Sequence, residues 1–147
     1  MAEITQLPRS AHGATASAVS FVDLGLRSGI VALTVATGLL HLSLGGLLFT
    51  LNGLGYLTAA VAMVIPLELA IRYRGLVRIG LVVYAATTIV GWYLMGPRYE
   101  TAYVAKAIEI GLIALLAVEI RRHDGSPVAI VRRALGDLLA ARRRVAT

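Results

Sequence analysis

Residues 29–71 contain a single charged side chain, Glu68, and one histidine, His41. A helix that crosses a membrane needs roughly 20 predominantly apolar residues to span a hydrocarbon core of about 30 Å. This stretch is therefore too long for one crossing and suits two helices that fold back on each other. Asn52-Gly53 near its middle favours a turn, because both residues tolerate positive φ. The sequence predicts an antiparallel pair of membrane helices, over residues 29–51 and 54–71.

Two further apolar segments follow, over residues 77–94 and 101–120. The first of them should end before Gly96-Pro97, because proline lacks an amide hydrogen and restricts the residue before it. Aromatic side chains gather around this stop, as they do at the interface of a membrane with water: Trp92, Tyr93, Tyr99 and Tyr103. The predicted fold is all-α, a four-helix transmembrane bundle that occupies residues 28–121.

Composition supports a membrane protein of one domain. Apolar residues make up 58% of the 147 positions, and the mean hydropathy is +0.79; soluble domains are typically about 45–50% apolar. The chain contains no cysteine, which excludes disulfides, iron–sulfur clusters, thiolate metal sites and thiol nucleophiles. The N-terminal segment, residues 1–27, lacks the pattern of a cleaved signal peptide. We therefore expect it to lie in the cytoplasm and the first helix to remain as an anchor.

Basic residues gather on one side of the predicted membrane. With four crossings, the segments before the first helix, between the second and third, and after the fourth share a side, and they hold twelve of the fourteen Lys and Arg residues. Cytoplasmic loops are enriched in these residues. We therefore expect both termini in the cytoplasm and a multi-pass protein of a prokaryotic cytoplasmic membrane. Because the basic residues follow the sides of the membrane, the net positive charge does not indicate a nucleic-acid partner.

The C-terminal segment, residues 122–147, predicts a fifth helix. Ser126 can cap its first turn, and Pro127 suits the first helical position. Apolar residues then fall on one face, flanked by Arg132, Arg133, Arg142, Arg143 and Arg144. A basic amphipathic helix directly after a cytoplasmic crossing is expected to lie on the anionic inner leaflet. A disordered basic tail and a docking helix for a protein partner are the alternatives.

Small residues recur at helical spacing in the predicted spans. The hydrophobic effect does not drive helices together in lipid, so helix faces made of small residues indicate where helices pack. The predicted packing positions are Gly38, Gly45, Gly55, Ala59, Gly80 and Gly91. Pro66 should bend the second helix. These faces suggest contacts within the bundle and with other membrane subunits or further copies of the chain.

Polar side chains also occur at membrane depth. At about 1.5 Å per residue from the cytoplasmic ends, His41, Thr88 and Glu109 fall in one layer, and Lys106 and Tyr56 lie about one turn further out. A central charge costs about 2.5–3.5 kcal/mol to insert, so the fourth helix needs its charged groups paired. Lys106 and Glu109 are three residues apart and can share a face. We expect these five residues to meet inside the bundle, and Glu68 and Glu119 to form ion pairs at the surface.

Three roles for this cluster remain open: a structural polar core, a pocket for a ligand such as a quinone, and haem ligation or proton movement. A bis-histidine haem b would need a second copy or another subunit, because only His41 lies at membrane depth. The chain shows no serine–histidine–acid constellation and no metal-ligand spacing, so we expect no catalytic residues, no metal site and no enzymatic activity.

Several short motifs resemble those of small four-helix membrane proteins of bacteria and archaea, for which no activity is established. The matching runs are Gly38 to Gly45, Asn52 to Tyr56, Gly91 to Tyr93 and Lys106 to Glu109. The resemblance implies the four-helix topology and an association of His41, Tyr56, Trp92, Lys106 and Glu109.

The leading functional hypothesis from the sequence is a non-catalytic subunit or packing partner of a membrane complex. The alternatives are a redox protein that binds haem or quinone near His41 and Glu109, and an oligomeric pathway for protons or ions.

Overall fold

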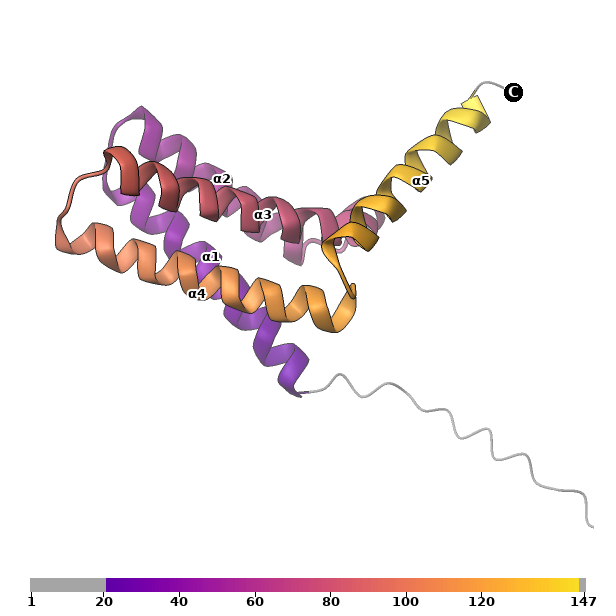
Figure 1. Cartoon of the computed structure of the whole chain (residues 1–147), viewed down its shortest axis with the longest axis horizontal. Coiled ribbons are helices and arrows are strands. Elements are labelled where there is room, and N and C mark those ends of the chain that lie inside the picture. The colour runs from indigo at the N-terminus through magenta and orange to yellow at the C-terminus, as the bar shows by residue number, and fades with distance from the viewer. Residues whose placement is uncertain (1–20, 146–147) are drawn as a thin grey trace, which may run out of the picture.

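The computed structural model describes residues 21–145, with side chains described to residue 141, and this part of the chain is entirely helical (Figure 1). The helices are α1 (Phe21–Ser43), α2 (Leu47–Val64), α3 (Glu68–Met95), α4 (Glu100–His123) and α5 (Pro127–Val145). The helices α1 to α4 are each long and apolar enough to cross a membrane. An all-α fold with four candidate membrane spans is therefore confirmed. Residues 1–20 of the predicted N-terminal segment lie outside the described residues.

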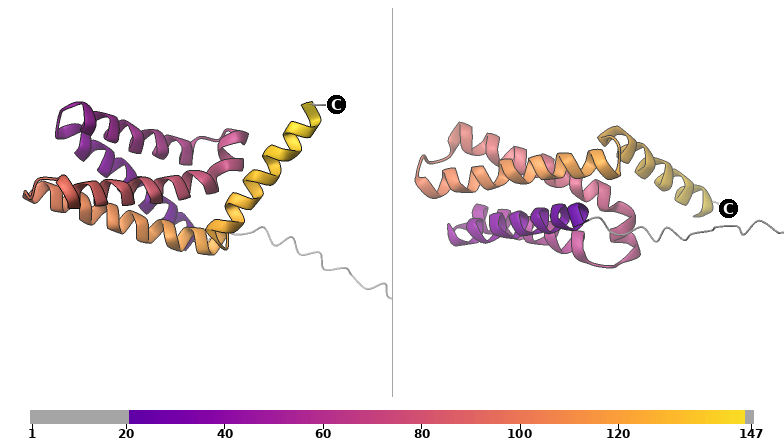
Figure 2. Two further views of the ribbon diagram at one scale, coloured as in Figure 1. Left: turned by 45° about the horizontal axis from the view of Figure 1, so that its top comes forward. Right: turned by 90° about the horizontal axis from the view of Figure 1, so that it is seen from below.

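The four spans form a closed ring. Helix α1 packs against α2 and α4, and α3 packs against α2 and α4, so the hairpin α1–α2 lies beside the hairpin α3–α4 (Figure 2, right). The connections α2–α3 and α4–α5 share one end, which we call the basic end because Arg72, Arg74 and Arg78 lie near it. The turn α1–α2 and the connection α3–α4 share the other, the aromatic end, where Trp92 and Tyr99 lie. Helix α5 leaves the basic end at a slant (Figure 1).

The predicted position of the first turn is wrong. The chain turns at Leu44-Gly45-Gly46, where the two glycines have φ of 71° and 82°, and Asn52-Gly53 lies inside α2. Consecutive residues with positive φ need glycine, because a Cβ is strongly disfavoured there. Asn-Gly permits a turn but does not require one. Both bounds of α1 therefore lie eight residues before those predicted, at 21 rather than 29 and at 43 rather than 51.

The predicted effect of Pro66 is also wrong. This proline does not bend a continuous helix but separates two helices, since α2 ends at Val64 and α3 begins at Glu68. Ile65 before it is extended, with φ of −61° and ψ of 131°, the backbone that proline favours in the preceding residue. Helix α3 consequently begins nine residues earlier than the predicted 77, and Glu68 is its first residue.

Glycine makes the closest contact between α1 and α2. A Cβ built on Gly53 would lie 2.8 Å from the carbonyl oxygen of Gly38 and 2.7 Å from a side-chain carbon of Leu42. Neither helix could keep its place if Gly53 carried a side chain. Gly55 similarly leaves room for the Tyr84 ring, whose hydroxyl would lie 2.6 Å from an added Cβ.

The other predicted packing positions differ among themselves. Ala59 is partly buried against the apolar core. Gly45 belongs to the turn, and a Cβ on Gly80 or Gly91 would meet no atom within 4 Å. Within this chain those three glycines do not make the close helix contacts that their spacing suggested.

Helix α5 is attached to α3 near the basic end. Ser126 caps it, accepting a hydrogen bond from the amide of Ala129 at 3.2 Å. Ile130 is buried at α3, where a Cβ on Gly75 would lie 3.0 Å from it. Arg72 donates to the Asp137 carboxylate at 2.9 Å, which holds the pKa of Asp137 below its ordinary value. The side chains of Arg142, Arg143 and Arg144 lie outside the described residues.

We predict that Gly53→Ala destabilises the protein and that Gly80→Ala does not. The added methyl group at residue 53 must push two helices apart, which costs about 1–3 kcal/mol. The same change at the exposed Gly80 should be neutral or stabilise by about 0.5 kcal/mol, because alanine is the better helix former. Reversible unfolding in mixed micelles measures both free energies. Equal effects would contradict the packing assigned to Gly53.

Candidate functional site

The structure brings together the five polar residues that sequence analysis placed at membrane depth. His41 comes from α1, Tyr56 from α2, Thr88 from α3, and Lys106 and Glu109 from α4. Glu109 lies at the centre of this cluster and is fully buried. Every helix of the four-span ring thus contributes to one polar interior.

Two hydrogen bonds hold the Glu109 carboxylate. Lys106 Nζ donates to its Oε2 at 2.6 Å, and the Tyr56 hydroxyl donates to its Oε1 at 3.2 Å. Tyr56 in turn lies 3.2 Å from the Thr88 hydroxyl, which connects the cluster to α3. A buried ion pair is tolerated only when its remaining polar atoms are also satisfied. Here the phenol supplies the second donor that the carboxylate requires.

The ring of His41 lies beside the Glu109 carboxylate. The Nδ1 atom of His41 lies 2.9 Å from the carbonyl oxygen of Thr37, which can only accept, so Nδ1 carries a hydrogen. The Nε2 atom on the other side of the ring lies 3.6 Å from Glu109 Oε1. Both side chains are buried, so they meet in a place from which water is excluded.

The pattern of α4 explains why its charged residues point inward. Its buried positions recur three or four residues apart along one face: Ala102, Ala105, Lys106, Glu109, Leu112, Leu116, Glu119 and Ile120. This face packs on α1 and α3. Intramembrane charges are costly unless they face such an interior and are paired. The charged residues of α4 are therefore both buried and paired because they lie on the face of the helix that packs inside the bundle.

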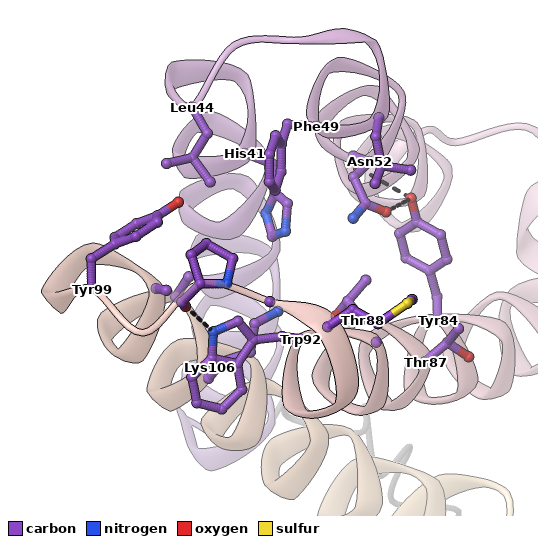
Figure 3. Close-up of a pocket in the computed structure, with 17 residues that line it drawn as sticks. His41, Leu44, Phe49, Asn52, Tyr84, Thr87, Thr88, Trp92, Tyr99 and Lys106 are labelled. Atoms are coloured by element: carbon purple, nitrogen blue, oxygen red, sulfur yellow. Dashed lines mark hydrogen bonds between the residues drawn. The ribbon is translucent and has the colours of Figure 1, made fainter.

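A cavity of about 370 Å³ adjoins the cluster at the aromatic end. Figure 3 shows His41 and Lys106 on its wall, with the aromatic rings of Phe49, Tyr84, Trp92 and Tyr99 around them. Its polar groups are few and fixed by hydrogen bonds.

Hydrogen bonds to the backbone and to a neighbouring amide fix the aromatic wall. The Tyr84 hydroxyl donates to Asn52 Oδ1 at 2.6 Å, and Trp92 Nε1 donates to the Pro97 carbonyl at 2.8 Å. The guanidinium of Arg98 stacks over the Trp92 ring at 4.6 Å from its centroid. The cavity is therefore bounded by oriented rings rather than by loosely packed side chains.

A second polar cluster at the basic end was not anticipated. Glu119, expected in a surface ion pair, is fully buried. It accepts from Arg78 Nη2 at 2.8 Å, while Arg78 Nη1 donates to Asp124 at 2.8 Å. Arg27 Nε lies 3.5 Å from Glu119. The signal was present in the sequence, since Glu119 continues the three- and four-residue spacing from Glu109 along α4.

Metal and haem binding find little support in this geometry. The described residues contain no group of three or more His, Asp or Glu side chains placed to hold a metal ion. Haem ligation through His41 Nε2 would break its contact with Glu109.

Comparison of the chain with protein-family models, with curated proteins and with solved structures found no match. The resemblance to four-helix membrane proteins of bacteria and archaea therefore stays a prediction.

We predict that Lys106→Met destabilises the protein more than the double change Lys106→Met with Glu109→Gln. The single change leaves a buried carboxylate without its cation, which costs about 3–5 kcal/mol. The double change removes both charges. Unfolding free energies of wild type, Lys106→Met, Glu109→Gln and the double variant give the coupling, with Tyr103→Phe on the exposed side of α4 as a neutral control. Purely additive effects would contradict the buried pair.

Proposed function

We propose that this protein binds a quinone in the cavity beside His41 and Lys106. The observation that carries the proposal is the combination of aromatic walls with the polar side chains of His41 and Lys106 on the inner wall of the same cavity. Small-molecule sites are mostly apolar cavities of about 300–1,000 Å³ with a few oriented polar groups. A quinone matches both parts, because it has a flat ring, carbonyl oxygens and an apolar tail.

The polar groups on the wall suit the carbonyl oxygens of such a ring. Lys106 carries hydrogens beyond the one that it donates to Glu109. Its ammonium group can strengthen a hydrogen bond to a ring oxygen that gains negative charge. The cavity is also bordered by apolar residues of α2 and α3, including Leu48 and Met95, which are exposed on the bundle surface. A tail could leave between them into lipid.

The other hypotheses stand as they did from the sequence alone. The described residues give no contact that bears on a larger membrane complex or on an oligomeric proton or ion pathway. By the enrichment of arginine in cytoplasmic loops, we place the basic end on the cytoplasmic side of a prokaryotic membrane. Both chain ends then lie in the cytoplasm.

We predict that a short-tailed quinone quenches the fluorescence of Trp92 in a saturable manner. This residue is the single tryptophan of the chain and lines the cavity. Gly91→Leu places a side chain at the cavity wall without touching the polar cluster, so it should weaken binding at least about tenfold, equivalent to about 1.4 kcal/mol. Gly80→Leu, on the same helix outside the cavity, should leave binding unchanged.

Fluorescence titration of the purified protein in detergent measures both changes. Quenching that rises linearly and equally in wild type, Gly91→Leu and Gly80→Leu would contradict the site, because it would show only partitioning of the quinone into micelles.

We also propose that α5 lies on an anionic membrane surface. Helix α5 exposes one apolar face, made of Val128, Val131, Leu135, Leu138 and Leu139. Arg132 next to this apolar face is exposed as well; Arg133 is also exposed, on the side of α5 where it donates to the Asp124 carbonyl at 3.1 Å. Apolar residues with flanking arginines suit the boundary between anionic headgroups and acyl chains. The attachment of α5 at the basic end of the spans supports this location.

We predict that a fluorophore at Leu138→Cys is quenched by nitroxide-labelled lipid when phosphatidylglycerol is present. The cysteine-free chain makes this label unique. Arg132→Gln with Arg133→Gln should reduce the quenching, because the attraction to anionic lipid is worth about 1 kcal/mol per basic residue. A label at Ala140→Cys, on another face of α5, should be quenched less. Equal quenching at both positions in neutral lipid would contradict the proposal.

A further inference from the structure

A second cavity, of about 520 Å³, lies at the basic end. Val31, Ala32, Met63 and Val64 form an apolar side, and Arg27, Ser28, Arg74 and Glu119 form a polar side. The apolar residues come from α1 and α2, and the charged residues come from α1, α3 and α4. The cavity thus joins an apolar wall to a charged wall at the basic end.

Two polar atoms on its wall lack partners. Oε2 of Glu119 and Nε of Arg74 are buried and make no hydrogen bond within the described residues. The Glu119 side chain is only 1% exposed, and a buried polar atom without a partner costs about 1–3 kcal/mol. The Oε1 atom of Glu119 is already occupied by Arg78 at 2.8 Å. A ligand that offers a donor to Oε2 and an acceptor to Arg74 would satisfy both atoms.

Opposite charges on one wall restrict the ligand further. Arg27, whose side chain is 47% exposed, and Arg74 suit an anion such as a phosphate. Glu119 suits a cation that carries N–H donors. A phosphodiester joined to a primary ammonium has both groups a few bonds apart. We propose that this cavity binds the phosphoethanolamine headgroup of a phospholipid.

The apolar side of the cavity favours the lipid over the soluble headgroup. Val31 and Met63 would contact an acyl chain, which free phosphoethanolamine lacks. Phosphatidylglycerol offers no cation to Glu119, and the quaternary ammonium of phosphatidylcholine offers no N–H donor. The site should therefore select phosphatidylethanolamine by the donors of its ammonium group.

Native mass spectrometry of the full chain, purified in detergent and offered the three phospholipids at equal concentration, tests the proposal. We expect wild type to bind one lipid and to retain about ten times more phosphatidylethanolamine than either of the other two lipids. One charge-assisted hydrogen bond supplies a preference of about this size. Glu119→Gln should remove this preference. Ala32→Phe, a change at an exposed position that fills the cavity and keeps every ion pair, should reduce retention of the lipid about tenfold.

Exposed Arg121→Gln, near the basic end but outside the cavity, is the matched control and should behave as wild type. Equal retention of all three lipids by wild type, or undiminished retention by Ala32→Phe, would overturn the proposal. Competition by free phosphoethanolamine at concentrations equal to the lipid would overturn the assignment to a lipid. Because the quinone cavity lies at the opposite end, quenching of Trp92 by quinone should be the same in Ala32→Phe and wild type.

Discussion

The buried carboxylate of Glu109 constrains the rest of the bundle. A bilayer core supplies no water, so each oxygen of that group must find its donors on the protein. Lys106 supplies one from α4, at 2.6 Å, and Tyr56 supplies one from α2, at 3.2 Å. His41 approaches from α1. Rotation of any of these helices would expose a polar group to lipid. The cluster therefore fixes how the helices face one another, while glycine at the α1–α2 contact fixes how closely they pack.

The two ends of the bundle differ in chemistry, because different side chains gather at each end. At the aromatic end, rings of α2, α3 and the α3–α4 connection surround a cavity whose inner wall includes His41, Thr88 and Lys106 of the polar cluster. At the basic end, arginines of α1 and α3 meet the buried Glu119. One end suits a flat ring with carbonyl oxygens, and the other suits a headgroup that carries both charges. The proposed quinone and headgroup sites are therefore separate, and their ligands should not compete.

Sequence reasoning predicted the membrane spans and the association of five polar residues, because both follow from the cost of placing polar groups in lipid. It misplaced the first turn because Asn52-Gly53 is compatible with a turn and with a close helix contact, and only packing against Gly38 decides between them. It treated Glu119 as a surface residue because neighbouring arginines in sequence suggested local pairing. Its partners Arg27 and Arg78 come from other helices, and such contacts depend on the helix arrangement. The cavities depend on side-chain packing, which no local pattern encodes.

The central claim is that Glu109 lies inside the bundle in contact with both Lys106 and His41. Solid-state NMR of the protein in bilayers, with labelled lysine, histidine and glutamate, measures the dipolar couplings that join these side chains. The account predicts a strong coupling between Lys106 Nζ and the Glu109 carboxyl carbon, as the 2.6 Å contact requires, and a weaker one to His41 Nε2. Absence of both couplings, with the Glu109 carboxyl in contact with lipid chains instead, would contradict it.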